Sequence, residues 1–265
     1  MAAILAGSRL AAHTLSLTAG SRATLKELFP AVPHIERFDL KSDVARDLLD
    51  NADYHIASVA IPYALATHEE FVMSTLEFMA ASGVQLSKRP RSYKAFEMHS
   101  ALFEACRVEE PERWIKLFHV LREMRNCITH RGGAVDARLH SAIGQMGAGA
   151  RDEWTRINRG ATPESIIANG RLALTATHIF TVFAVAKQIG REINDALSTR
   201  IDSSVWAGVA VTDFSESTAK TKNSPNWRKA LMGHVRYYYA GANISASDLE
   251  VAARSTGAWT SAKWE

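Results

Sequence analysis

The sequence predicts an all-α protein, a helical bundle with an N-terminal arm and a C-terminal helical extension. Long stretches rich in Ala and Leu place apolar residues three and four positions apart, which is the spacing of a buried helix face. Gly and Pro stand mostly at the borders of these stretches, where helices begin and end. No segment shows the sustained alternation of apolar and polar residues that is typical of a half-buried strand.

Composition narrows the class of protein further. The chain has 265 residues, of which 47% are hydrophobic, and this favours one core domain with extensions. The formal net charge of +3 permits an anionic partner such as nucleic acid without arguing for one. Two cysteines without a CxxC pair indicate a reducing compartment and give no zinc spacing, so we expect no metal and no cofactor. No apolar run approaches the roughly 20 residues of a membrane helix, so we expect a cytoplasmic protein that does not bind a membrane.

Residues 1–41 are expected to form the arm, in which Pro30 and Pro33 mark the approach to the bundle. No acidic residue precedes Glu27, and the basic residues there stand among Ala, Ser, Leu and Thr. This composition is similar to that of an organellar transit peptide. An ordinary amphipathic or frayed N-terminal segment is the interpretation that we favour.

The helical bundle is expected over residues 42–199. Ser42 is the expected N-cap of a helical stretch that runs to about Met79, as two helices or as one kinked at Pro62. Gly83 is expected to follow the end of this stretch. Further helices are expected at residues 94–105, 111–129 and 164–197, with an irregular segment at 134–162 and a stop at Gly132-Gly133.

Residues 200–265 form the expected extension, in which the periodicity is weaker. Residues 205–211 are compatible with a short strand, and Ser245 is placed to cap a short helix. Residues 215–239 interleave Lys and Arg with Trp227 and three consecutive tyrosines, a mixture that can hold single-stranded RNA. The interpretation that we favour is that these aromatic residues pack on the bundle while the basic side chains face water.

The helix expected at 111–129 has two different faces when its residues are placed at about 100° intervals. Its apolar stripe holds Trp114, Leu117, Leu121, Met124 and Ile128, and its polar face holds His119, Glu123, Asn126 and His130, with Arg122 beside that face and Arg125 between the two. His130 therefore projects from the polar face at the last turn of the helix.

The position of His130 bears on its protonation. The negative end of the helix dipole favours the imidazolium form, whereas the guanidinium groups of Arg125 and Arg131 disfavour it. A histidine held between these two effects can act as a general acid or base. A solvated polar face without function is the alternative for so short a pattern.

The run Arg125-Asn126-x-x-x-His130, followed by Arg131 and two glycines, resembles the signature of HEPN domains. In that family an Arg, often followed by Asn, precedes a His near the C-terminal end of a core helix. The apolar spacing before the motif, the segment Glu69-Glu70-Phe71 in an earlier helix and the segment 193–197 in a late helix also fit the family. The resemblance covers about residues 44–197 and leaves the arm and the extension outside.

The resemblance implies a bundle that pairs as a homodimer, with one composite cleft where the two motif helices meet. It implies a metal-independent endoribonuclease, acting as a toxin or an anti-phage defence effector, with an RNA substrate and an antitoxin or defence-system partner protein. By the resemblance, His130 is the acid–base group, Arg125 clamps the phosphate, and Asn126 orients either the histidine or the phosphate by hydrogen bonds. Further contacts with the RNA are expected from Arg131, Arg122, His119 and Glu70.

Two other functions stay open. The first is a non-catalytic HEPN-like module that dimerises or that binds RNA or nucleotide without cutting it. The second is a helical regulator that binds DNA through the C-terminal region, although no recognition-helix pattern is present there. Cleavage of RNA without metal distinguishes the nuclease from both.

Overall fold

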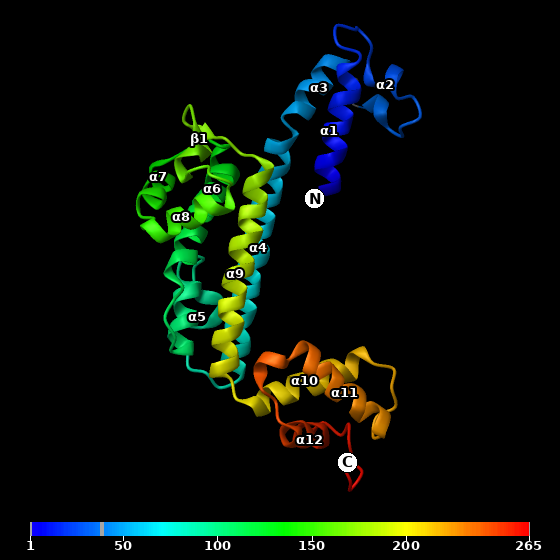
Figure 1. The fold of residues 1–265 in the computed structure, drawn as a ribbon, viewed down its shortest axis with the longest axis vertical. Coiled ribbons are helices and arrows are strands. Elements are labelled where there is room, and N and C mark those ends of the chain that lie inside the picture. The colour runs from blue at the N-terminus through cyan, green and yellow to red at the C-terminus, as the bar shows by residue number, and fades with distance from the viewer. Residues whose placement is uncertain (1, 38–39, 265) are drawn as a thin grey trace. The chain divides into compact units, whose positions relative to one another are not determined.

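The protein is mostly helical in the computed structural model, which describes residues 2–37 and 40–264 (Figure 1). Helix accounts for 70% of the chain, and the described residues contain a single sheet of two very short strands. The all-α prediction is therefore confirmed.

The elements follow one another along the chain, mostly with short connections. The α-helices are α1 (Ala2–Ser16), α2 (Leu25–Leu28), α3 (Ser42–Asp50), α4 (Ala52–Ala81), α5 (Met98–Cys106), α6 (Glu112–Arg131), α7 (Ala137–Gly144), α8 (Ala148–Ile157), α9 (Ala176–Arg200), α10 (Ser203–Ser217), α11 (Pro225–Tyr238) and α12 (Ala246–Ser255). The 3-10 helices are η1 (Ile35–Arg37), η2 (Pro90–Ser92), η3 (Pro163–Ile166) and η4 (Ala240–Ala242), and the strands are β1 (Ile167–Ala168) and β2 (Arg171–Leu172).

The chain divides into two compact units. The first comprises residues 1–68 and 116–186, and the second comprises residues 69–115 and 187–265. The long helices α4, α6 and α9 contribute residues to both units.

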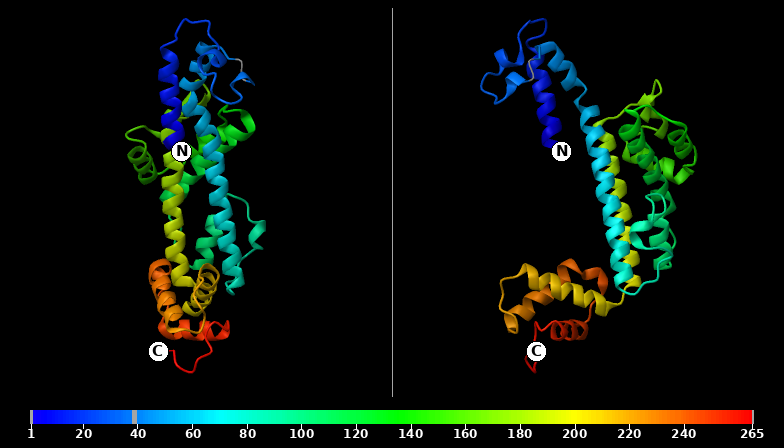
Figure 2. Two further views of the ribbon diagram at one scale, coloured as in Figure 1. Left: turned by 90° about the vertical axis from the view of Figure 1, so that its right-hand side faces the viewer. Right: turned by 180° about the vertical axis from the view of Figure 1, so that it is seen from behind.

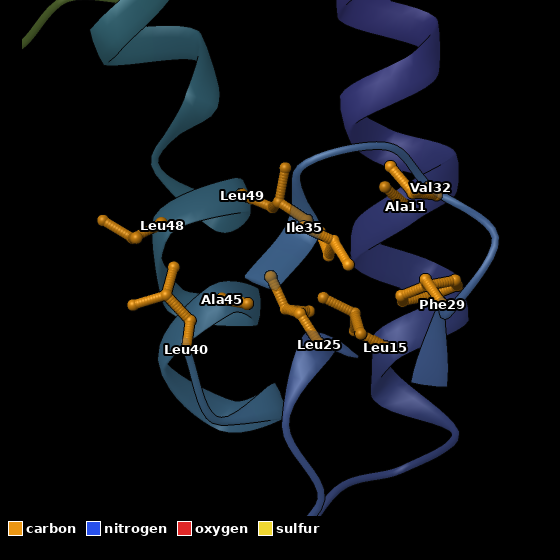
Figure 3. A pocket seen from close by; sticks show the side chains of 10 residues that line it. All are labelled: Ala11, Leu15, Leu25, Phe29, Val32, Ile35, Leu40, Ala45, Leu48 and Leu49. Atoms are coloured by element: carbon orange, nitrogen blue, oxygen red, sulfur yellow. The ribbon is translucent and has the colours of Figure 1, made fainter. Parts of the chain in front are cut away.

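The N-terminal residues, expected to form an arm, are helical and have packing partners within the first unit. α1 packs against α3. Together with α2 and η1 these helices surround an apolar pocket of about 380 Å³, into which Leu15, Phe29 and Ile35 project (Figure 3). Leu15 is almost fully buried, so this part of the chain has apolar packing of its own.

In the rest of the first unit, α6 and α8 bury apolar side chains. Leu121 and Met124 on α6 are fully buried, as is Trp154 on α8. β1 and β2 form an antiparallel hairpin in which Ile167 pairs with Leu172.

Two segments of the first unit differ from the prediction. The segment 134–162, expected to be irregular, contains α7 and α8. The helix expected to begin at Glu164 begins at Ala176, because the β1–β2 hairpin comes first. Asn169 and Gly170, the two residues between its strands, both have positive φ, as a tight hairpin turn requires.

Helix boundaries near the N-terminal part of the bundle follow the sequence signals in part. Ser42 lies inside α3 and Lys41 is its N-cap, so the predicted cap is wrong by one residue. The break in the long stretch falls at Asn51, and Pro62 lies inside α4. Gly83 ends α4 as predicted, with a φ of +83°.

The C-terminal helices of the second unit, α10, α11 and α12, are grouped together near the C-terminus (yellow-orange to red in Figure 2). They share a hydrophobic core. Trp227 on α11 is fully buried in this core, and Trp259 near the C-terminus is only 3% exposed. The strand considered for residues 205–211 is wrong, because these residues lie in α10. Ser245 caps α12 as predicted, accepting a hydrogen bond from the backbone N–H of Asp248.

Candidate functional site

The C-terminal end of α6 positions the residues of the predicted motif. Gly132 and Gly133 follow the helix with φ of +56° and +87°, which reverses the chain after Arg131. The N–H of Gly133 donates to the carbonyl of Cys127 at 2.9 Å and closes the last turn. The predicted stop of this helix is confirmed.

The reversed chain is tied to the β1–β2 hairpin. The N–H of Leu172 donates to the carbonyl of Gly133 at 2.9 Å, and Nη2 of Arg171 donates to the carbonyl of Gly132 at 2.6 Å. Gly133 also lies so close to the hydroxyl of Tyr54 that a Cβ at this position would be 2.5 Å from it. The backbone just after the motif is therefore hydrogen-bonded to the hairpin and lies directly against Tyr54.

The motif opens into a cavity of about 450 Å³ at this end of α6. The cavity is lined by Asn126, His130, Arg131, Asp136 and Arg138. His130 is exposed, and Asn126, one helical turn earlier, lies on the same side of α6. Two predicted catalytic residues and one predicted substrate contact thus meet at one surface.

The cavity carries charges of both signs, with the basic groups in excess. Nη1 of Arg131 lies 3.6 Å from Oδ2 of Asp136. The Asp136 carboxylate also caps α7 by accepting from the backbone N–H groups of Arg138 and Leu139, at 3.0 and 3.2 Å. Asp136 is thereby committed to holding the backbone, and the guanidinium of Arg138 adds further positive charge to the wall.

A buried carboxylate orients Asn126. Glu123 is only 7% exposed, and its Oε2 accepts a hydrogen bond from Nδ2 of Asn126 at 3.0 Å. Its Oε1 accepts from Nη2 of Arg122 at 2.7 Å. On the predicted polar face of α6, Glu123 therefore accepts hydrogen bonds from both Asn126 and Arg122, so Arg122 contacts the site through Glu123.

Arg125 lies on the flank of α6 and is half-buried. Within the described part of the chain it is not among the residues that line the cavity. The structure therefore brings Asn126 to His130 and leaves Arg125 outside the cavity of a single chain.

His119 stands eleven positions before His130, about 16 Å away along the helix axis. Burial, followed by the nearby charge of Arg122, lowers the pKa of His119 to about 4. Its ring packs edge to face with that of Phe118. His119 is therefore neutral at pH 7 and cannot offer a positive charge to a phosphate.

Glu70, predicted as a substrate contact, lies in the second unit and is engaged there. Its two carboxylate oxygens accept from Nη1 and Nη2 of Arg91 at 2.8 and 2.9 Å. These hydrogen bonds lower the pKa of the Glu70 carboxyl. Arg91 also donates to Glu77, so the three side chains form an exposed ion-pair network.

Sequence reasoning missed Asp136 and Arg138 as neighbours of His130. They reach the cavity because the chain reverses at the two glycines and starts α7 at once. An Asp followed by a helical segment directly after a Gly-Gly stop is an N-cap signal that could have placed α7 there.

Among the described residues, no group of three or more His, Cys, Asp or Glu side chains is arranged to hold a metal ion. Nor does any helix in the described ranges combine the length and the apolar character needed to cross a bilayer. No protein-family model matches the chain, and no curated protein or solved structure gives a significant match.

Proposed function

We propose that this protein is a metal-independent endoribonuclease of HEPN type, with His130 as its acid–base group. One observation supports this most directly: the exposed imidazole of His130 shares an open cavity with Asn126 and with the guanidinium groups of Arg131 and Arg138. A proton-transferring group beside positive charge is what cleavage of a phosphodiester requires.

The reaction that suits this arrangement is an internal transesterification. A base removes the proton of the 2′-OH, whose oxygen attacks the phosphorus, and an acid gives a proton to the leaving 5′-oxygen. The products are a 2′,3′-cyclic phosphate and a free 5′-OH, with no net consumption of protons. In this proposal Arg131 and Arg138, which line the cavity, bear the negative charge of the pentavalent phosphorane.

The two proton transfers need two groups, whereas the cavity of one chain holds one imidazole. A homodimer that brings two α6 ends together would supply a second His130 and would carry Arg125 toward the phosphate. The dimer, the clamping role of Arg125 and the biological role as a toxin or anti-phage effector are parts of this proposal and rest on the motif.

A non-catalytic RNA-binding module is the second candidate, and one observation favours it. Arg125, the expected phosphate clamp, does not line the cavity, whereas the carboxylate of Asp136 does. Such a module would bind RNA with an affinity that falls as salt rises and would cut nothing.

Cleavage of a labelled single-stranded RNA in EDTA distinguishes the two candidates. We expect the wild-type chain to release fragments that end in a 2′,3′-cyclic phosphate. His130→Ala should slow cleavage by at least about 100-fold because the acid–base group is gone. His140→Ala is the matched control, because His140 is also exposed and lies on α7 outside the cavity lining.

Both variants replace exposed side chains, so their thermal unfolding should match that of the wild type. Equal cleavage by His130→Ala and wild type would refute the assignment of His130. RNA binding without any cleavage by the wild type would favour the non-catalytic module.

A further inference from the structure

The C-terminal end of α11 carries two tyrosines that the core does not take up. Tyr237 and Tyr238 are 79% and 69% exposed, and their rings meet edge to face with centroids 4.6 Å apart. Trp227 on the same helix is fully buried. The interpretation that we favoured, in which the aromatic residues of this segment pack on the bundle, is therefore wrong for these two tyrosines, and Trp227 is buried in the core of α10–α12 instead.

Neighbouring side chains contact the exposed rings and are themselves hydrogen-bonded. The ring of His234 lies 4.8 Å from that of Tyr238, between centroids. Nε2 of His234 is 2.9 Å from Oδ2 of Asp213, and the hydroxyl of Tyr239 donates to the same oxygen at 2.9 Å. A pair of aromatic rings held in this way loses little conformational freedom when a planar ligand stacks on it.

The segment of the chain that carries these rings has charged residues of one sign only. Residues 217–247 contain no Asp or Glu, and they hold Lys220, Lys222, Arg228, Lys229 and Arg236. Lys229, Gly233, Arg236 and Tyr237 are exposed and fall within about 100° of arc on α11, and the exposed Tyr238 follows about 100° beyond Tyr237. The nearest acid described above, Asp213, is engaged by His234 and Tyr239.

The chemistry of this face favours a single-stranded nucleic acid over the other anionic partners. The aliphatic residues Leu231 and Val235 of α11 are buried in the core of α10–α12, so the helix has no apolar face with which to enter a bilayer. A nucleic acid duplex hides the faces of its bases, whereas a single strand exposes them for stacking on aromatic rings.

We propose that α11 binds single-stranded RNA, with bases stacked on Tyr237 and Tyr238 and with phosphates held by Lys229 and Arg236. The inference deepens the proposed function, on which it rests for the identity of the nucleic acid as RNA. The side chains that carry it all belong to the second unit, so it stands on observations separate from His130 and its cavity.

Binding is measured on the full chain carrying His130→Ala, so that the RNA stays intact. The probe is a fluorescent oligouridylate of about 12 nucleotides, a length within the usual site size of such surfaces, followed by fluorescence anisotropy. Tyr237→Ala/Tyr238→Ala should weaken binding at least about fivefold, whereas Tyr237→Phe/Tyr238→Phe keeps the rings and should retain it. Tyr63→Ala is the matched control, because Tyr63 is 76% exposed on α4.

A second pair of variants tests the phosphate contacts. Lys229→Gln/Arg236→Gln should lower the slope of log affinity against log salt by about 1.4, because two contacts with a single strand are lost. Lys187→Gln/Arg191→Gln removes the same two charge types from exposed positions of α9 and should leave the slope unchanged. Far-UV circular dichroism checks that every variant is folded.

Unchanged affinity in Tyr237→Ala/Tyr238→Ala would overturn the inference, as would an equal loss in the control variants. So would equal affinity for the same length of duplex RNA. Binding of phosphatidylserine vesicles that depends on these residues, without binding of the oligouridylate, would identify a membrane surface instead.

The two proposals fail separately. If the wild type binds RNA through α11 but does not cleave it in EDTA, the nuclease is refuted and this surface stands. If it cleaves RNA while the α11 variants bind it normally, the surface is refuted and the nuclease stands.

Discussion

Alanine in place of each of the two glycines after α6 tests how the end of this helix is built. Gly132 has a φ of +56°, and a Cβ there would meet nothing within 4 Å. Gly133 has a φ of +87°, and a Cβ there would lie 2.5 Å from the Tyr54 hydroxyl and 3.8 Å from Cζ of that ring. The pair therefore separates the cost of the backbone conformation from the cost of the contact.

The expected magnitudes follow from these distances. Gly132→Ala should lower the free energy of unfolding by about 1–2 kcal/mol, the cost of a left-handed conformation for a residue with a Cβ. Gly133→Ala should lower it by about 2–5 kcal/mol, because overpacking against Tyr54 adds about 1–3 kcal/mol to that cost. Tyr54→Phe removes the hydroxyl and leaves the ring at an ordinary contact distance, so the excess should shrink in that background.

Urea unfolding followed by far-UV circular dichroism measures these differences, and a double-mutant cycle between positions 133 and 54 isolates the contact. Gly132→Ala serves as the control for backbone strain. Equal losses for the two alanine variants, or an excess that persists with Tyr54→Phe, would refute the close approach of Tyr54 to this turn.

Two further predictions concern buried groups in the first unit. Glu123→Ala removes the carboxylate that accepts hydrogen bonds from two side chains, so we expect the free energy of unfolding, measured in urea, to fall by about 1–3 kcal/mol. Glu109→Ala, at an exposed position, should lower it by less than about 0.5 kcal/mol. Equal losses in the two variants would show that the Glu123 carboxylate does not support the helix. Burial lowers the pKa of His68 from 6.5 to about 4, so between these values the unfolded chain binds the proton and the folded chain does not. The contribution of neutral His68 to the free energy of unfolding is therefore complete above pH 6.5. It is lost as the pH falls toward 4, which lowers that free energy by at most about 3 kcal/mol. Urea unfolding across this pH range should show a flatter profile for His68→Leu than for the exposed control His140→Gln, and identical profiles would contradict the burial argument.

The long periodic helix was predictable because several independent signals agree there. Apolar residues at three- and four-residue spacing, a starting proline and a terminal pair of glycines place it at 111–129, and α6 runs from Glu112 to Arg131. Short elements were harder to predict. α7 and α8 have eight and ten residues, too few to show a clear period among the glycines of that segment.

In the C-terminal helices, tertiary packing overrides the local preference of residues for β-strand. Residues 205–211 contain three valines, which favour strands, yet Ala207, Ala210 and Phe214 of α10 are buried at helical spacing in the core of the C-terminal helices. The β1–β2 hairpin did have a sequence signal, the pair Asn169-Gly170, which the prediction of a helix over residues 164–197 did not take into account.

Two residues of the candidate site could be predicted from one helix, and two others depend on the chain reversal that follows it. Asn126 and His130 share a side of α6 by helical spacing alone, so the sequence was enough to pair them. Asp136 and Arg138 join them only because two positive-φ glycines turn the chain back. Arg125 is close in sequence, but a helical rotation of about 140° separates it from His130.

The fastening of Gly132 and Gly133 to β2 has a consequence for communication within the first unit. A strand of two residues has few hydrogen bonds of its own. A ligand that binds the hairpin turn at Asn169 therefore acts on the backbone that directly follows His130 and Arg131. Under the proposed function, a ligand that binds the hairpin therefore need not enter the cavity to change the geometry beside His130. A shift of β2 would strain the hydrogen bonds to Gly132 and Gly133, which directly follow the last turn of α6.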